Sequence, residues 1–367
     1  MGVTGLFKFL KDKYGDNIYE HVHMSHLSYK IIYFDISSYI FSYIKIYGNQ
    51  TNKWLNGFVK MFMLFKQYRI HLIPVFDGKS PPEKKEERED RKLQVEKSDE
   101  KCMNISMDLE SYKNTGTVSD LLQDTMKRLS KNSQKSGARL LGPDPKKEYI
   151  DVELLQDYIY KKEVALTDIS KNDIQQLQDL LKAFGIPFIQ APDEAETLCC
   201  DLVKRGLGYA AFSLDSDCVA YDTSFIINDI DMTSHTFRII DMKKLYTIIE
   251  LSPEQLRDLC ILCGVDYNRH SKPKTGLGPV SSYKLLKEYG SFDEVIKVKN
   301  IQNADGYRHK RCNELFSLTY PYISDDYVWE SIQSETLIKY LKENKLLCDV
   351  NKISSYWQPI KLVFEDA

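Results

Sequence analysis

Three short apolar segments of this chain each lead to an aspartate. Residues 30–35 (KIIYFD) and 71–77 (HLIPVFD) are mostly apolar runs of the length of a buried strand. Residues 209–213 (YAAFS) form a third run, and Asp215 and Asp217 follow it closely. The pattern predicts three buried strands with acids at their carboxyl ends, which is where open α/β sheets bind their ligands.

Helical periodicity fills most of the chain between these strands. We predict helices over residues 36–47, 53–69, 172–184, 195–205, 242–249, 253–263 and 279–289, and further strands over 186–190, 224–229 and 236–240. Some helices have clear end signals, since Ser252-Pro253 opens one, Pro279 opens another and Gly290 closes it. This alternation of strands and helices predicts an α/β fold.

The segment from residue 79 to residue 150 breaks the pattern. Residues 79–97 are dense in charge of both signs and contain Pro81-Pro82, which predicts a solvent-exposed helix. From residue 98 onward Ser, Lys and Asn abound, and Gly-Pro-Asp-Pro occupies 142–145. We predict a poorly packed, partly flexible excursion with one or two helices, such as one over 118–129.

Composition is that of an ordinary soluble globular protein. Of the 367 residues, 43% are hydrophobic, and no apolar run approaches the roughly 18 residues that cross a bilayer. Cys260 and Cys263 lie inside the apolar run LCILCGV, so we interpret this pair as a buried helix face and not as a zinc or redox site. Reduced thiols predict an intracellular protein. The net charge of −3 does not indicate nucleic-acid binding, although a cluster of acids would mask local basic surfaces.

Two pairs of acids lie in the stretch from residue 191 to residue 217. Glu194 and Glu196 fall in the first turn of a predicted helix, and Asp215 and Asp217 follow the next strand. Carboxylates gathered at one sheet edge repel one another unless cations neutralise them, and an all-oxygen cluster suits Mg²⁺ or Mn²⁺ better than zinc. The alternative for any single pair is a set of surface acids around an ordinary strand-helix unit.

A glycine-rich turn precedes the helix predicted at 279–289. Gly276 and Gly278 allow a tight backbone, and such a turn at a helix N-terminus presents free N–H groups to a phosphate. Basic residues surround the turn: Arg269, Lys272, Lys274, Lys284 and Lys287. We therefore interpret the turn as a candidate contact to a phosphate backbone.

Together these motifs resemble the flap endonuclease/XPG superfamily of structure-specific 5′-nucleases. The resemblance rests on MGVTGLFKFL at 1–10, DISS at 35–38, VFDG at 75–78, DEAET at 193–197, SLDSDC at 213–218, LCILCGVDY at 259–267 and GLGP at 276–279. It implies a mostly parallel central sheet flanked by helices, the PIN-like 5′-nuclease core. A helical cap or arch and a helix-hairpin-helix module that binds duplex DNA complete the implied architecture.

The resemblance also implies a division of the chain. Residues 1–92 and 171–250 would form the nuclease core, residues 93–170 the helical cap or arch, and residues 251–300 the helix-hairpin-helix module. Residues 301–367 would form a helical, aromatic tail that packs on the core.

By the same resemblance, two Mg²⁺ ions, for which Mn²⁺ can substitute, bind to the acids Asp35, Asp77, Glu194, Glu196, Asp215, Asp217 and Asp266. One ion would activate a water that attacks phosphorus, and the other would stabilise the leaving oxygen. Lys84 and Arg91 match the family's catalytic cations, and Phe41 matches an aromatic that stacks on a base beside the scissile phosphate. Other DNA contacts are expected at Gly2, Lys272, Lys274, Gly276, Gly278 and Lys284.

The chain departs from the family's pattern in three places. The segment between Asp77 and Glu194 is longer than usual, which affects the cap and the treatment of 5′ ends. The extra residues NRHSKPKT at 268–275 put the family's K⁺ site, built partly of backbone oxygens, in question. The tail QPIKLVF at 358–364 lacks an aliphatic residue and an aromatic of the sliding-clamp peptide, so we do not expect clamp binding.

The leading prediction is a monomeric Mg²⁺-dependent 5′-flap endonuclease with 5′-to-3′ exonuclease activity on branched or flapped DNA, in replication, repair or recombination. A duplex-end exonuclease or a four-way-junction resolvase would share every core residue. A non-catalytic DNA-binding relative would have lost acids, and a glycosyltransferase D-x-D motif would leave Asp35 and Asp77 unexplained. A chain rich in Ile, Lys, Asn and Tyr suggests an AT-rich genome, of a virus or a protist. The expected location is the nucleus or, for a virus, the host cytoplasm or replication site.

Overall fold

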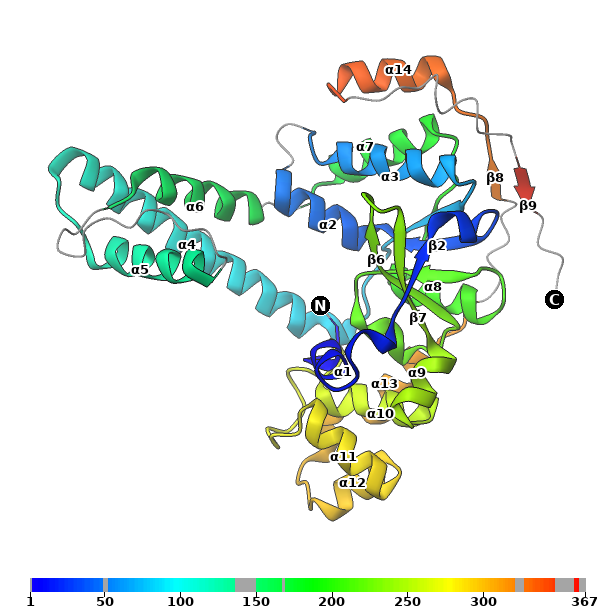
Figure 1. Cartoon of the computed structure of the whole chain (residues 1–367). Helices are drawn as coiled ribbons and strands as arrows, with labels where there is room; N and C mark the ends of the chain where they lie inside the picture. Colours follow the sequence, from blue (N-terminus) through cyan, green and yellow to red (C-terminus); the bar gives the residue numbers. More distant parts are fainter. Residues whose placement is uncertain are drawn as a thin grey trace. The chain divides into compact units, whose positions relative to one another are not determined.

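The structure is a computed structural model that describes residues 2–48, 52–135, 150–166, 169–320, 327–346 and 360–362. Figure 1 shows the chain, which divides into two compact units. The first unit comprises Met1–Tyr43, Asn52–Arg88 and Ile169–Ala367, and the second comprises Ile44–Thr51 and Glu89–Asp168. Each unit is described by itself.

A seven-stranded sheet forms the centre of the first unit, in the order β1-β7-β6-β5-β2-β3-β4. Its strands are β1 (Glu20–His23), β2 (Ile31–Asp35), β3 (His71–Phe76), β4 (Ile189–Gln190), β5 (Ala210–Phe212), β6 (Phe225–Asp231) and β7 (Thr236–Asp241). The pairs from β6 through β5, β2 and β3 to β4 are parallel, whereas β7 is antiparallel to β6 and β1 to β7. The predicted mostly parallel sheet is confirmed. Apolar patterning does not predict β1, because the edge strand EHVH contains only one aliphatic residue.

Helices cover both faces of this sheet because neighbouring residues of a buried strand point to opposite sides. Tyr33 belongs to the core under α1 (Leu6–Tyr14), α8 (Ala195–Lys204), α9 (Met242–Ile249) and α10 (Pro253–Cys263). Phe34 points the other way, toward the side of α2 (Ile36–Tyr47), α3 (Leu55–Gln67) and α7 (Lys171–Ala183), and its ring contacts Phe212 and Tyr39. The result is the predicted three-layer α/β arrangement.

Two helices and the loop between them form a hairpin in the region predicted as a DNA-binding module. The hairpin consists of α10, which starts at the predicted Ser252-Pro253 with a capping box of Ser252 and Gln255, and α11 (Pro279–Tyr289), which has Gly290 as its C-cap. Cys260 and Cys263 are free and buried, as predicted for a helix face. The chain continues through α12 (Phe292–Val298), α13 (His309–Phe316), β8 (Tyr327–Trp329) and α14 (Ser334–Glu343).

The second unit corrects the prediction of a poorly packed excursion. The helix α4 (Lys85–Thr115) begins in the first unit and runs well past the predicted end at residue 97, and α5 (Asp120–Lys135) and α6 (Val152–Ala165) follow it. These helices share a small apolar core of Cys102, Ile105, Leu109, Leu122, Ile150, Leu155 and Ile159. The full length of α4 is hard to predict from apolar periodicity, because this long helix is mostly polar. The segment 142–145 lies outside the described residues.

Short elements complete the chain. Across the described ranges, short 3-10 turns occur at η1 (Gly15–Ile18), η2 (Met24–Leu27), η3 (Pro82–Lys84), η4 (Ser216–Ala220) and η5 (Ala304–Tyr307). The tail segment at 358–364 was compared above with the sliding-clamp peptide. Of this segment the structure describes only β9 (Ile360–Leu362), which pairs antiparallel with β8. Within the described part of the chain, every helix is too short or too polar to cross a membrane.

Candidate active site

The carboxyl ends of three parallel strands bring four of the predicted acids to one edge of the sheet. Asp35 is the last residue of β2, and Asp77 follows β3 directly. Asp215 lies beyond β5 as the N-cap of η4, and Asp217 is in the first turn of η4. Because these strands are parallel neighbours, their carboxyl ends share one crevice.

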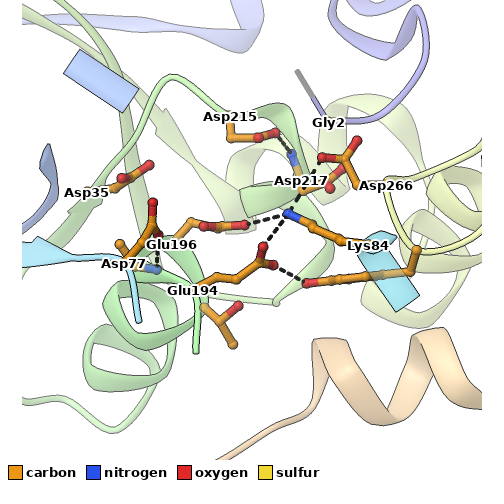
Figure 2. A network of polar contacts seen from close by, with 12 residues as sticks. Gly2, Asp35, Asp77, Lys84, Glu194, Glu196, Asp215, Asp217 and Asp266 are labelled. Atoms are coloured by element: carbon orange, nitrogen blue, oxygen red, sulfur yellow. Dashed lines mark hydrogen bonds and ion pairs between the residues drawn. The ribbon is translucent and has the colours of Figure 1, made fainter. Parts of the chain in front are cut away.

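The remaining acids come from two helices that pack on the same edge. Glu194 is the N-cap of α8 and Glu196 lies in its first turn, whereas Asp266 follows the end of α10. Figure 2 shows all seven acids facing one space, with Asp35 and Asp77 on one side and Asp215 and Asp266 on the other. The structure therefore brings together every acid that the sequence predicted.

Lys84 occupies the middle of this cluster (Figure 2). Its Nζ lies 2.7 Å from Glu194 Oε1, 3.4 Å from Glu196 Oε1 and 3.5 Å from Asp266 Oδ2. Burial alone would lower the pKa of Lys84, but the neighbouring carboxylates, chiefly Glu196 and Glu194, raise it well above its usual value. The ammonium group is therefore a fixed positive charge in an acidic site.

Arg91, the second predicted cation, belongs to the second unit, whereas Lys84 closes η3 in the first. The joint role of the two cations stays a prediction.

Hydrogen bonds orient several of the acids. Asp35 Oδ2 accepts a bond of 2.7 Å from the Ser213 hydroxyl, and Asp77 Oδ1 accepts one of 2.8 Å from the backbone N–H of Ala195. Tyr267, which the sequence analysis did not single out, donates its hydroxyl to Glu194 Oε2 at 2.9 Å. Its position directly after Asp266 in the motif GVDY was the signal available in the sequence.

Asp217 has no such support. Its side chain is 1% exposed, and neither carboxylate oxygen has a hydrogen-bond partner among the described residues. Burial, followed by the charges of Asp215 and Asp266, raises the pKa of Asp217 well above its usual value. A buried carboxylate without a donor is costly unless a cation compensates it, so this residue indicates a cation site.

Other carboxylates of the cluster also have raised pKa values. Burial raises the pKa of Asp35, and Asp77 and Glu196 add to the shift. For Glu194, burial and the charge of Glu196 raise the pKa to about 8 despite the ion pair with Lys84. Within the described residues, the protein's own groups therefore leave part of the negative charge of this site uncompensated.

The donor set fits hard divalent cations. All seven groups are carboxylates, which Mg²⁺ and Mn²⁺ prefer. Among the described residues, however, no three His, Cys, Asp or Glu side chains converge closely enough to hold a metal ion by themselves. Mg²⁺ usually keeps several of its waters, so the donors fit an ion that some acids contact through water.

Gly2, predicted as a DNA contact, packs against the acids at η4 (Figure 2). Its φ is +90°, and a Cβ at this position would overlap Asp215 Oδ1 and crowd Ser216 Oγ. The Ser216 hydroxyl also accepts a bond of 2.8 Å from the backbone N–H of Val3. Only glycine fits here, because both the backbone angle and the space exclude a side chain.

The basic residues around the hairpin differ in what they contact. Lys272 Nζ donates to the carbonyls of Leu262 and Cys263, at 3.3 and 2.6 Å, and so caps the C-terminus of α10. Sequence reasoning missed this structural role. Lys274 and Lys284 are exposed.

The remaining predicted DNA contacts also have definite places. Gly276 is exposed with φ +70°, Gly278 is the N-cap of α11, and Phe41 is half-buried on α2. The contacts of all these residues with DNA stay predictions.

Comparison with known proteins identifies the family of the chain. Residues 1–98 match the XPG N-terminal domain, and residues 185–266 match the XPG I-region. The chain belongs to the XPG family of nucleases. The two matched segments contain every acid of the XPG-family site described above, Asp266 being the last matched residue.

Relatives of this XPG-family chain come from viruses and from cellular organisms. A RAD2-like endonuclease of Invertebrate iridescent virus 3 is 29% identical over 80% of this chain and 81% of its own length. Flap endonuclease 1 of Lodderomyces elongisporus is 26% identical over 94% of this chain and 83% of its own length. The catalytic core of Rad2 in complex with DNA substrate superposes with a TM-score of 0.60 at 18% identity, over 94% of this chain and 95% of that one. The PIN-like nuclease fold predicted for the XPG-family chain is confirmed.

Proposed function

We propose that this protein is a structure-specific 5′-nuclease that hydrolyses DNA phosphodiester bonds near junctions between single and double strands. The activity would be that of a 5′-flap endonuclease with 5′-to-3′ exonuclease action. One observation carries the proposal: seven carboxylates of an XPG-family chain meet around a buried lysine at the carboxyl edge of a parallel sheet. Relatives named flap endonuclease 1 and a structural neighbour bound to a DNA substrate support it.

Two divalent cations, Mg²⁺ or Mn²⁺, would complete the site. Asp215 and Asp266 raise the pKa of Asp217, and Asp77 and Glu196 raise the pKa of Asp35, while Glu196 also acts on Asp215 and Asp217 and so connects the two parts of the cluster. We assign one cation to the side of Asp217 and one to the side of Asp35, each held partly through water, because no three acids among the described residues converge closely enough to hold an ion by themselves. Bound there, the cations would activate water for attack on phosphorus and neutralise charge on the leaving oxygen.

The residues of the chain would prepare the site for a phosphodiester. Lys84 places positive charge among the acids, so a phosphate that enters meets less repulsion, and the charge that develops in the transition state is stabilised more than the ground state. Arg91 would add a planar guanidinium that can hold two phosphate oxygens.

The hairpin of α10 and α11 would bind the duplex beside the cleavage site. The exposed Lys274 and Lys284 and the N-terminus of α11 behind Gly278 offer charge and N–H groups to the phosphate backbone. A K⁺ ion in the loop between the helices stays a prediction. The viral relatives favour a viral setting, and within it a role in DNA replication, repair or recombination in the infected cell.

Cleavage of a panel of labelled DNAs tests the proposal. The panel contains a 5′ flap, a 3′ flap, a nick, a blunt duplex and a four-way junction of the same sequence, with product ends mapped to the nucleotide. We expect the 5′ flap to be cut near the junction and the 3′ flap to resist. Preferential, symmetric cutting of the four-way junction would assign the protein as a resolvase, and release of mononucleotides from the blunt duplex alone as an exonuclease. No cleavage of any member would reject the proposal.

A further inference from the structure

Arg308, the N-cap of α13, and Arg311 within α13 contact the base of α4, which we define as residues 83–86, on either side of Lys84. Arg311 Nε lies 2.6 Å from Glu83 Oε1, and Arg308 Nη2 lies 3.3 Å from Glu86 Oε1. Glu83 immediately precedes Lys84 in η3. The contacts join segments more than 220 residues apart in the sequence, all within the first unit.

Arg308 connects the same helix base with the acid-bearing loop after α10. Its Nη1 donates to the carbonyl of Tyr267 at 3.1 Å, and the hydroxyl of Tyr267 donates to Glu194 at 2.9 Å. Arg308 also has a φ of +50°, a left-handed conformation that non-glycine residues rarely adopt. Such a conformation persists only where surrounding contacts enforce it, and this one places the guanidinium between two parts of the active site.

The helix that carries the arginines is itself held in place. His309 Nε2 lies 2.6 Å from Asp258 Oδ1 of α10, and the His309 ring stacks on Phe292 of α12 with centroids 3.9 Å apart. These contacts fix the position of α13 relative to α10 and α12. Arg308 and Arg311 can therefore restrain the base of α4.

Of the two acids in these ion pairs, Glu83 is the better shielded from solvent, although the Arg311 side chain that it contacts is itself 48% exposed. The Glu83 side chain is 16% exposed, whereas that of Glu86 is 52% exposed. Glu83 Oε2 is buried without a hydrogen-bond partner in the described part of the chain, so Arg311 is the main compensation for its charge. An ion pair between two exposed side chains contributes little to stability, and a charge-assisted hydrogen bond to a shielded carboxylate contributes more.

We propose that Arg311, supported by Arg308, is a positioning residue that sets the place of the Lys84 ammonium among Glu194, Glu196 and Asp266. Arg311 holds Glu83, Glu83 fixes the turn η3, and η3 presents Lys84. The inference rests on the nuclease function proposed above. It matters for catalysis because a displacement of about 1 Å in a positioned group can lower a rate by about 100-fold.

Single-turnover cleavage of a 5′-flap DNA tests this assignment. We expect Arg311→Gln and Glu83→Gln each to lower the rate by about 10- to 100-fold while the dissociation constant for the flap stays unchanged. Lys310→Gln is the matched control, because it removes one positive charge from an exposed position of the same helix. The exchanged pair Glu83→Arg with Arg311→Glu should recover part of the lost rate.

A double-mutant cycle separates positioning from a general loss of stability. If Arg311 acts through Lys84, Arg311→Gln has no further effect on the rate in a Lys84→Ala background. An undiminished effect in that background would overturn the proposal, as would an Arg311→Gln protein that cleaves at the wild-type rate.

A second readout does not need activity. Acetylation of Lys84 by an amine-reactive reagent, followed by peptide mass spectrometry, reports whether the ammonium is still buried among the acids. We expect Lys84 to react slowly in the wild type and in Lys310→Gln, and faster in Arg311→Gln. Equal protection in all three proteins would contradict the inference. A wild type that protects Lys84 in this way but cleaves no DNA would reject the proposed function and leave the positioning intact.

Discussion

Asp217 and Gly2 show how closely single residues of the site depend on one another. Asp217 is buried, and neither of its carboxylate oxygens has a hydrogen-bond partner among the described residues. Gly2 packs against the side chain of Asp215. The N-terminal segment therefore forms part of the wall of the acid cluster. A change at Gly2 reaches the acids without altering any of their charges.

Replacing Gly2 by alanine should lower cleavage because the new Cβ displaces Asp215 and Ser216. We expect a loss of about 10- to 100-fold in the single-turnover rate. Gly5→Ala is the matched control, since Gly5 has a similar φ of +70° but a Cβ there would meet only the side chain of Pro279 at ordinary distance. Both variants carry the backbone strain of about 1–2 kcal/mol, so equal rates in the two proteins would show that strain alone is responsible.

Among the elements, the hairpin of α10 and α11 combines residues that hold the loop with residues that face solvent. Lys272 caps α10 through two carbonyls, whereas Lys274 is exposed. The sequence places both among the basic residues of one loop and cannot separate these roles.

The salt dependence of duplex binding should distinguish the two lysines. If Lys274 contacts a phosphate, Lys274→Ala reduces the slope of log affinity against log salt by about 0.9 and leaves the unfolding temperature unchanged. Lys272→Ala should instead lower the unfolding temperature, because the last carbonyls of α10 lose their donor. A slope unaffected by Lys274→Ala would remove this residue from the interface.

The elements also show what the sequence could predict. Asp35, Asp77 and Asp215 are predictable from the sequence because each lies at or just after the end of a buried apolar strand, and the parallel order of those strands brings them together. No sequence pattern predicts the contacts of Arg308 and Arg311, because their partners Glu86 and Glu83 lie more than 220 residues away in the chain. The core of the second unit was missed for another reason, because its apolar residues are sparse on a long charged helix.

At the scale of the whole molecule, the acid cluster links stability to pH and to cations. The pKa of Glu194 is about 8 in the folded protein, against an ordinary value of 4.5. Between these values the folded state binds more protons than the unfolded state, so the free energy of unfolding decreases as the pH rises. Each such group contributes a slope of up to about 1.4 kcal/mol per pH unit.

Thermal unfolding in EDTA should therefore show a midpoint that falls from pH 5 to pH 8, within the window set by the pKa shift of Glu194. Mg²⁺ should raise the midpoint, and more at pH 8 than at pH 6, because it competes with protons for the carboxylates. Glu194→Gln keeps an acceptor for the Tyr267 hydroxyl and should make the pH dependence in EDTA shallower. A midpoint that rises steadily with pH in EDTA would contradict this account of the cluster.

The most direct test of the central claim compares wild type with Asp217→Asn in single-turnover cleavage of one 5′-flap DNA, with Mg²⁺ and with EDTA. Asparagine removes a buried, uncompensated charge and keeps the shape of the side chain, so the protein should fold at least as stably in EDTA and bind the flap. We predict that wild type cleaves near the junction only with Mg²⁺, and that Asp217→Asn is slower by at least about 100-fold at saturating protein. Cleavage by Asp217→Asn at the wild-type rate, or by wild type in EDTA, would contradict the claim that this carboxylate cluster hydrolyses DNA with divalent cations.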